Sequence, residues 1–149
     1  MKHNFIYIFF AFLILGSCSR KKDKFLNKKF HSTTTKYNYL FNGNNLLIQG
    51  IDQANSDLTE NFWELIPIEK FDLKKINATE KEQSIFTDAE EKATLAIQKH
   101  SMSIMGEERN PIMDEAYLLL GKSRYYDGRY IPSLEAFNYI LYKLSLIHI

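Results

Sequence analysis

Apolar side chains recur at helical spacing along most of the chain after residue 36. The first stripe is interrupted by one polar position, Asn44, and consists of Tyr37, Leu40, Phe41, Leu47, Ile48 and Ile51. Spacing of the form i, i+3, i+4, i+7 indicates an amphipathic helix. Any of Thr33, Thr34 and Thr35 can cap its start, and Gly50 is expected to end it.

A second helical stripe lies between residues 80 and 101. Its apolar positions are Ile85, Phe86, Ala89, Ala93, Ala96, Ile97 and His100. Thr79 and Glu82 have the spacing of a capping box, which predicts the start of this helix just before the stripe. Since His100 extends the stripe, we interpret it as a packing residue at the helix end and not as a metal ligand.

The segment between these two helices is rich in aromatic residues and contains a proline. Ala54, Leu58, Phe62 and Leu65 fit a short helix, which Pro67 would end because proline lacks an amide donor. Trp63 is expected to be a core anchor between helices. The alternative is an exposed tryptophan that contributes strongly to binding a partner.

The clearest pattern spans residues 114–144 and resembles one tetratricopeptide repeat. The residues that carry this resemblance are Tyr117, Leu120, Gly121, Gly128, Tyr130, Ser133 and Phe137. The resemblance implies that Tyr117 and Leu120 are the large residues of a first helix, and that Gly121 lets two helices approach closely. It also implies a turn at Gly128.

The second helix of this repeat would open at Tyr130. Ser133 stands where the repeat usually has alanine, Phe137 is the expected anchor, and Ile140 departs mildly from the consensus. Pro132 would fall in the first turn, where a missing donor costs little. Gly43 and Gly50 have the same seven-residue spacing as Gly121 and Gly128, which suggests an earlier, degenerate repeat.

The first 18 residues have the pattern of a lipoprotein export signal. A short positive segment is followed by an apolar run at residues 5–15, which is too short to cross a bilayer. Residues 15–18, Leu-Gly-Ser-Cys, resemble the bacterial lipobox. The resemblance implies cleavage before Cys18 and lipidation of its sulfur; the alternative is an ordinary secretory signal with a chance cysteine.

Together these patterns predict an all-α fold of tetratricopeptide-like antiparallel helix pairs, an α-solenoid. We expect a signal peptide at residues 1–17, a lipidated, flexible, basic stem at 18–34, the helical domain at 35–144 and an unassigned tail at 145–149. Repeat units cannot cover their own apolar faces, so neighbours must do so. The chain is therefore expected to be a fragment whose array originally continued.

Charge is distributed unevenly along the chain, although the formal net charge is only +1. Seven Lys or Arg residues and one acidic residue lie between Arg20 and Lys36, whereas fifteen acidic and seven basic residues lie between Asp52 and Glu115. The basic stem could be a solvated linker or could attract anionic lipid head groups; these interpretations are compatible.

The sequence contains no recognised catalytic motif. It has no phosphate-binding glycine loop, no H-E-x-x-H pair, no G-x-S-x-G elbow and no C-x-x-C pair, and its four histidines are scattered. Cys18, the only cysteine, is assigned to lipid. We therefore expect a protein that is not an enzyme and has no cofactor, metal site, small-molecule substrate or nucleic-acid partner.

Several segments taken together resemble one family. The lipobox, the Cys-Ser-Arg-Lys-Lys stem, residues 35–43 and residues 114–122 are similar to the N-terminal part of gliding-motility tetratricopeptide lipoproteins associated with type IX secretion in Bacteroidetes. The resemblance implies a scaffold, lipid-anchored to the outer membrane, that binds proteins of the envelope secretion machinery. Basic and not acidic residues after Cys18 favour a periplasm-facing position. The alternatives are a general envelope tetratricopeptide lipoprotein, serving outer-membrane assembly or nutrient uptake, and the non-catalytic N-terminal part of an envelope enzyme.

Overall fold

The computed structural model describes residues 19–56, 62–63, 65 and 84–144, and most of these residues are helical. The prediction of an all-α fold is confirmed. The described strands, β1 (Ser103–Ile104) and β2 (Glu107–Glu108), form a short antiparallel pair between two helices. None of the described helices is both long enough and apolar enough to cross a membrane. The predicted signal peptide, Cys18 and the tail at 145–149 lie outside the described residues.

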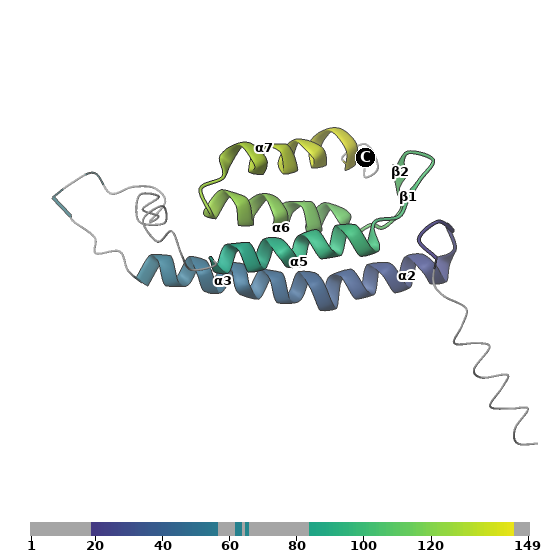
Figure 1. Ribbon diagram of the computed structural model, residues 1–149, viewed down its shortest axis with the longest axis horizontal. Coiled ribbons are helices and arrows are strands. Elements are labelled where there is room, and N and C mark those ends of the chain that lie inside the picture. The colour runs from purple at the N-terminus through teal and green to yellow at the C-terminus, as the bar shows by residue number, and fades with distance from the viewer. Residues whose placement is uncertain (1–18, 57–61, 64, 66–83, 145–149) are drawn as a thin grey trace, which may run out of the picture.

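The N-terminal part is one long helix in three consecutive pieces. These are α2 (Phe25–Thr34), the π-helical segment η1 (Thr35–Leu40) and α3 (Phe41–Ser56) (Figure 1). The predicted flexible stem is therefore wrong for residues 25–34, which form helix. The predicted stop at Gly50 is also wrong, because helix α3 continues for six residues beyond it.

The π-helical segment changes which side chains of this helix are buried. Asn27, His31 and Thr35 are buried at four-residue steps, but the next buried residue, Leu40, follows after five. A π-helical turn adds one residue, so it returns the following α-helix to the same face of the body. Gly43, Leu47 and Gly50 then continue the buried face.

Part of the predicted apolar stripe is wrong. Leu40 and Leu47 are in the core, as expected, whereas Tyr37, Phe41 and Ile48 are exposed. Tyr37 lies within η1, whose wider turn moves it away from the side of the helix that carries Leu40. Phe41 and Ile48 lie in α3 one position after Leu40 and Leu47, beside the buried face.

Helix α5 (Ile85–His100) lies at the centre of the packing. Its Ser84 N-cap accepts a hydrogen bond from the Phe86 amide at 3.2 Å. The expected capping box at Thr79 and Glu82 lies outside the described residues. The predicted stripe is buried at Phe86, Ala89, Ala93, Ala96 and His100. The alanines are fully buried, and α5 contacts both α3 and α6.

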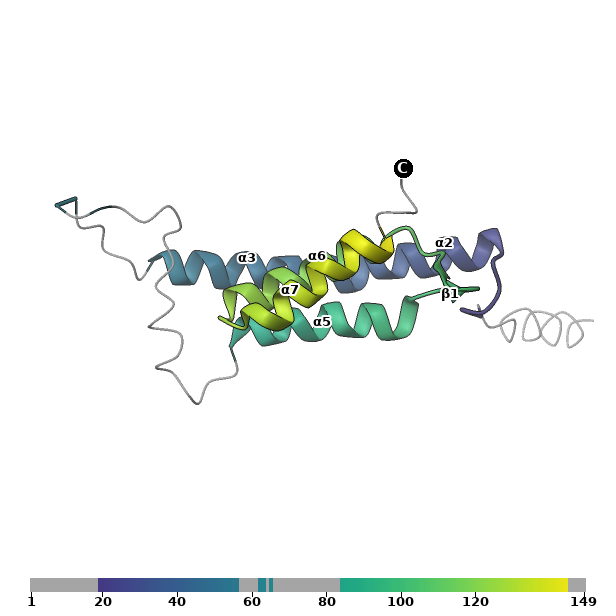
Figure 2. The ribbon, with the colours of Figure 1, turned by 90° about the horizontal axis from the view of Figure 1, so that it is seen from above.

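The C-terminal part is a helical hairpin made of α6 (Met113–Tyr126), α7 (Tyr130–Tyr139) and the π-helical segment η2 (Ile140–Leu144). From α3 through α5 and α6 to α7 the helices alternate in direction, and α6 lies between α5 and α7 (Figure 1). Seen from above, α7 crosses over α6 while α3 and α5 lie side by side (Figure 2). Met113, Ala116 and Leu119 of α6 complete the core with the alanines of α5.

The prediction that Trp63 anchors the core is wrong. Its side chain is 97% exposed, and Phe62 and Leu65 are exposed as well. The core between α3 and α5 contains Leu47 and Phe86 instead, and Gly50 of α3 lets the ring of Phe86 approach closely. The expected break at Pro67 lies outside the described residues.

Candidate protein-binding surface

The turn between α6 and α7 is built around Gly128. This residue has a φ of +76°, in the left-handed region that glycine adopts without steric cost. Its amide donates to the Tyr125 carbonyl at 3.0 Å, and the Arg129 amide donates to the Arg124 carbonyl at 2.9 Å. The chain therefore reverses within three residues, and α7 must pack directly on α6.

Close approach of α6 and α7 depends on Gly121. A Cβ atom at this position would overlap the ring of Phe137, so only a hydrogen lets the ring lie against the α6 backbone. Nearby, the buried Ser133 hydroxyl donates to the Gly121 carbonyl at 2.7 Å. The structure thus brings together three of the residues singled out in the sequence.

The other repeat-packing residues lie around this contact. Leu120 is buried, and Tyr117 is half-buried with its ring stacked on Tyr139, the centroids being 4.2 Å apart. Burial and the neighbouring Tyr139 raise the pKa of Tyr117, so its phenol stays neutral. Tyr130 begins α7, but 44% of its surface is exposed, and its ring contacts Tyr125 edge-to-face.

An ion-pair network, which the sequence did not indicate, joins α5 to this hairpin. The Glu90 carboxylate accepts from the Arg124 Nε at 2.7 Å and also pairs with Arg129, whose Nε donates to Asp127 at 2.6 Å. Burial opposes ionisation of Glu90, but the bonds from Arg129 and Arg124 outweigh it and hold the pKa of Glu90 below its usual value. The turn is thereby attached to the central helix.

The exposed side of α7–η2 is mostly apolar, with Glu135 and Lys143 as its charged members. The exposed large side chains on it are Ile131, Leu134, Leu141 and Tyr142, and we call this set the outer α7 face. Ile131 and Tyr142 are 75% and 73% exposed. The opposite side carries the buried Ser133, Ala136 and Leu144. Helices that are apolar on both sides normally lie between two packing partners, so the outer α7 face is the candidate protein-binding surface.

A second cluster that the sequence did not indicate joins α2 to the end of α5. The Nδ1 atoms of His31 and His100 lie 2.9 Å apart, and the rings of Phe30 and Tyr39 pack around them. Burial, followed by the positive charges of His31, Lys99 and Arg20, lowers the pKa of His100 to about 4. The expectation that His100 packs at a helix end is confirmed, because it is the buried last residue of α5. His31 lies in the segment predicted to be a flexible stem, where no buried contact was expected.

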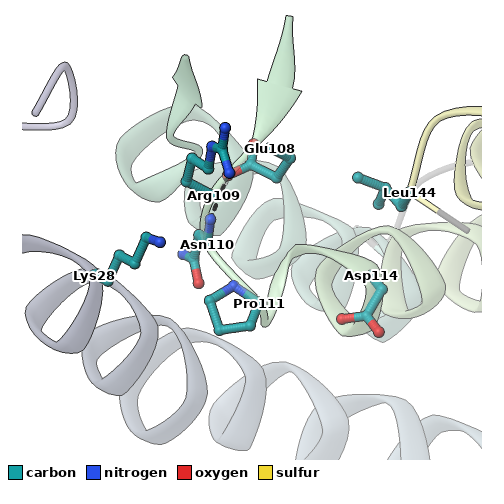
Figure 3. A pocket seen from close by; sticks show the side chains of 7 residues that line it. All are labelled: Lys28, Glu108, Arg109, Asn110, Pro111, Asp114 and Leu144. Atoms are coloured by element: carbon teal, nitrogen blue, oxygen red, sulfur yellow. Dashed lines mark hydrogen bonds between the residues drawn. The ribbon is translucent and has the colours of Figure 1, made fainter. Parts of the chain in front are cut away.

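A small open pocket lies where α2, the β2–α6 connection and η2 meet (Figure 3). Its volume is about 120 Å³, well below the roughly 300–1,000 Å³ of typical small-molecule sites. Its polar groups already have structural partners: Glu108 accepts from the amides of Met102 and Asn110, and the Asn110 side chain donates to the His100 carbonyl at 3.0 Å. We interpret the pocket as a by-product of this connection.

Within residues 19–56, 62–63, 65 and 84–144, no group of three or more His, Cys, Asp or Glu side chains is placed to hold a metal ion. Comparison with known proteins found no family model and no curated protein that matches this chain.

Proposed function

We propose that this chain is the N-terminal part of a tetratricopeptide-type scaffold lipoprotein that is anchored in the outer membrane, faces the periplasm and binds other proteins. The process we assign to it is type IX protein secretion and gliding motility. In this proposal its partners are proteins of the envelope secretion machinery, and it performs no catalysis.

The observation that carries the proposal is the α6–α7 hairpin with its apolar outer α7 face. The contact of Gly121 with Phe137 and the turn at Gly128 hold α6 and α7 together as a helix pair. Helix pairs are the units that stack in helical repeat proteins. A stacked array presents a continuous surface to extended or helical segments of a partner. The outer α7 face is where a following repeat or a partner helix would pack.

Support for the anchor comes from the sequence. The apolar run at residues 5–15, the small residues before Cys18 and the basic residues after it form the lipobox pattern described above. Several acyl chains on one sulfur and its amine bind a bilayer far more stably than one chain does. Confinement to the membrane would raise the effective concentration of the scaffold for envelope partners.

The anchor is tested by replacing the lipidated cysteine. With Cys18→Ala, incorporation of radiolabelled palmitate should be lost, and the protein should leave the membrane fraction. Ser17→Ala keeps the cysteine and serves as the matched control, with labelling retained. Unchanged membrane retention of Cys18→Ala would refute the lipid anchor.

The binding surface is tested by site-specific photocrosslinking in native envelopes of the source bacterium. A photoreactive benzoylphenylalanine replaces Leu134 on the outer α7 face of the tagged full-length protein, and the same group replaces the exposed Asn45 of α3 as a control. We expect a secretion-machinery protein, or a later part of the same protein, crosslinked at position 134 and not at 45. Crosslinks to outer-membrane assembly or uptake proteins would favour a general envelope scaffold. Recovery of cytoplasmic proteins alone would refute the proposal.

A further inference from the structure

The residues that directly follow Cys18 are held against the helical body. The side-chain amide of the buried Asn27 donates to the Ser19 carbonyl at 2.7 Å and to the Lys22 carbonyl at 3.2 Å. The Arg20 guanidinium donates to the carbonyl of Gln98 near the end of α5. The residue next to the lipidation position is therefore attached to the start of α2, and no free linker separates the two.

Two large apolar side chains are exposed at this start of α2. Phe25 is 78% exposed and Leu26 is 73% exposed, while the opposite side of the helix is buried at Asn27, His31 and Thr35. Exposing large apolar side chains to water is unfavourable compared with burying them. Adjacent exposed apolar residues therefore commonly mark a contact surface. Because Phe25 and Leu26 lie only seven and eight residues after Cys18, the proposed lipid anchor would bring this surface close to the bilayer.

The charge around Phe25 and Leu26 is almost entirely positive. Lys21, Lys22 and Lys24 are exposed on the segment that precedes them. Asp23, the one acidic residue between Arg20 and Lys36, is paired with Lys28 at 2.8 Å and lies 3.6 Å from Arg109. The negative charge is thus compensated locally, and the three lysines give the surface a positive potential.

We propose that residues 21–26 dock this protein onto the bilayer that holds its acyl chains, with Phe25 and Leu26 at the level of the lipid head groups and Lys21, Lys22 and Lys24 on anionic lipid. The proposal rests on the lipid anchor of the proposed function. In this arrangement the scaffold is not loosely tethered, and its long N-terminal helix has a defined orientation at the membrane.

The chemistry of this surface favours a lipid bilayer over a protein partner. A segment that places exposed lysines directly before exposed aromatic and aliphatic side chains matches a head-group region, where charge and apolar surface are both accommodated. Each basic residue near an anionic surface strengthens binding by about fivefold. Because the acyl chains already hold this segment at the bilayer, the docking is effectively intramolecular.

The experiment measures the depth of a spin label in the reconstituted, acylated protein. Since Cys18 is the only native cysteine and is lipidated, Leu26→Cys offers one thiol for a nitroxide. Gln49→Cys, an exposed position on the same long helix, is the matched control. Each protein is placed in phosphatidylcholine vesicles containing phosphatidylglycerol. We expect the label at 26 to be several-fold less accessible to a water-soluble paramagnetic quencher, and more accessible to oxygen, than the label at 49.

A charge variant tests the role of the lysines. Lys21→Gln, Lys22→Gln and Lys24→Gln together should raise quencher access at position 26 when phosphatidylglycerol is present. Without phosphatidylglycerol, the same change should have little effect. No effect of the triple change in either lipid would overturn the assigned role of these lysines.

Three other outcomes would contradict the docking or assign this surface to something other than a bilayer. Equal quencher access at positions 26 and 49 in acylated protein would overturn the docking while leaving the anchor intact. Shielding that occurs in detergent and rises with protein concentration would assign the surface to a second copy of the chain. Failure of the lipid anchor would be detected separately, because the protein with its native Cys18 would then incorporate no palmitate.

Discussion

The α3–α5 and α6–α7 pairs both bring helices close together by placing glycine opposite a large side chain. In the C-terminal pair, Gly121 faces Phe137. In the N-terminal pair, a Cβ on Gly50 would lie 2.5 Å from the Cγ2 of Ile85 and 2.7 Å from the Cε1 of Phe86. The packing solution is therefore shared, although close approach of two helices at a glycine was predicted only for the C-terminal pair.

The packing of the two pairs differs in how readily it is predicted from the sequence, because the segments that join the two helices of each pair differ. Helices α6 and α7 are joined by three residues, so their contacts are local and follow regular α-helical spacing. Between α3 and α5 lie residues 57–84, and the helix leading into α3 contains the π-helical η1. A motif in a continuous segment is easier to recognise than contacts that depend on distant residues and a shifted helical phase.

The largest expected effect is at Leu119, which links the two pairs. Leu119 is 2% exposed on α6, and a Cβ on Gly43 of α3 would lie 2.5 Å from its Cδ2. Leu119→Ala should lower the free energy of unfolding by about 2–5 kcal/mol, because it leaves a cavity in the core. Leu118→Ala, at a more exposed neighbouring position, is the control and should cost much less. Chemical unfolding followed by circular dichroism measures both; equal effects would show that the pairs are not joined at Leu119.

The second largest effect is expected from valine substitutions at the glycines where the helices of each pair approach closely. Gly121→Val and Gly50→Val should each destabilise the protein by about 1–3 kcal/mol, because the added methyl groups overlap the facing side chains. Combining Gly121→Val with Phe137→Leu should recover part of this loss by making room at the interface. If Gly50→Val left the unfolding midpoint unchanged, the close packing of the N-terminal pair would be contradicted.

A third effect depends on pH and concerns only the N-terminal part. Since the pKa of His100 is lowered to about 4 in the folded protein, from an ordinary value of 6.5, the unfolded chain binds the proton more tightly. Stability is therefore fully present above pH 6.5 and is lost as the pH falls towards 4. The expected loss by about pH 5 is about 1–2 kcal/mol.

His100→Gln removes this titration and is the control for it. The variant should show a flatter dependence of melting temperature on pH between about 7 and 5, whatever its stability at neutral pH. An unchanged slope would assign the pH dependence to other groups. Glu90, whose pKa is lowered, loses its stabilising contribution only as the pH falls through the acidic range below its ordinary value of 4.5.

The smallest effect distinguishes the observed helical phase from the one expected for an unbroken α-helix. Tyr37 is exposed, whereas Leu40 is buried. Tyr37→Ser should change the free energy of unfolding by less than about 0.5 kcal/mol, as surface substitutions usually do. Leu40→Ala should cost several times more. A large loss at Tyr37 would contradict the burial pattern that η1 produces.

The sequence alone determined the helical class of the protein, the stripe of α5 and the local packing of the C-terminal hairpin. These features depend on residues close together in the chain: alanines at helical spacing, a glycine with left-handed φ at a turn, and the Gly121, Ser133 and Phe137 set. Cys18 and the signal pattern before it are likewise properties of a short contiguous segment, from which the proposed anchor follows.

Only the tertiary structure decided the phase and extent of the N-terminal helix. Which face of residues 25–56 is buried depends on α5 and α6, which come later in the chain, and the π-helical η1 is kept because it aligns both halves with those helices. The His31–His100 contact, the Glu90 network and the attachment of Ser19 to Asn27 also join distant residues. Such contacts leave no periodic trace in a sequence, because their geometry exists only once the helices have packed.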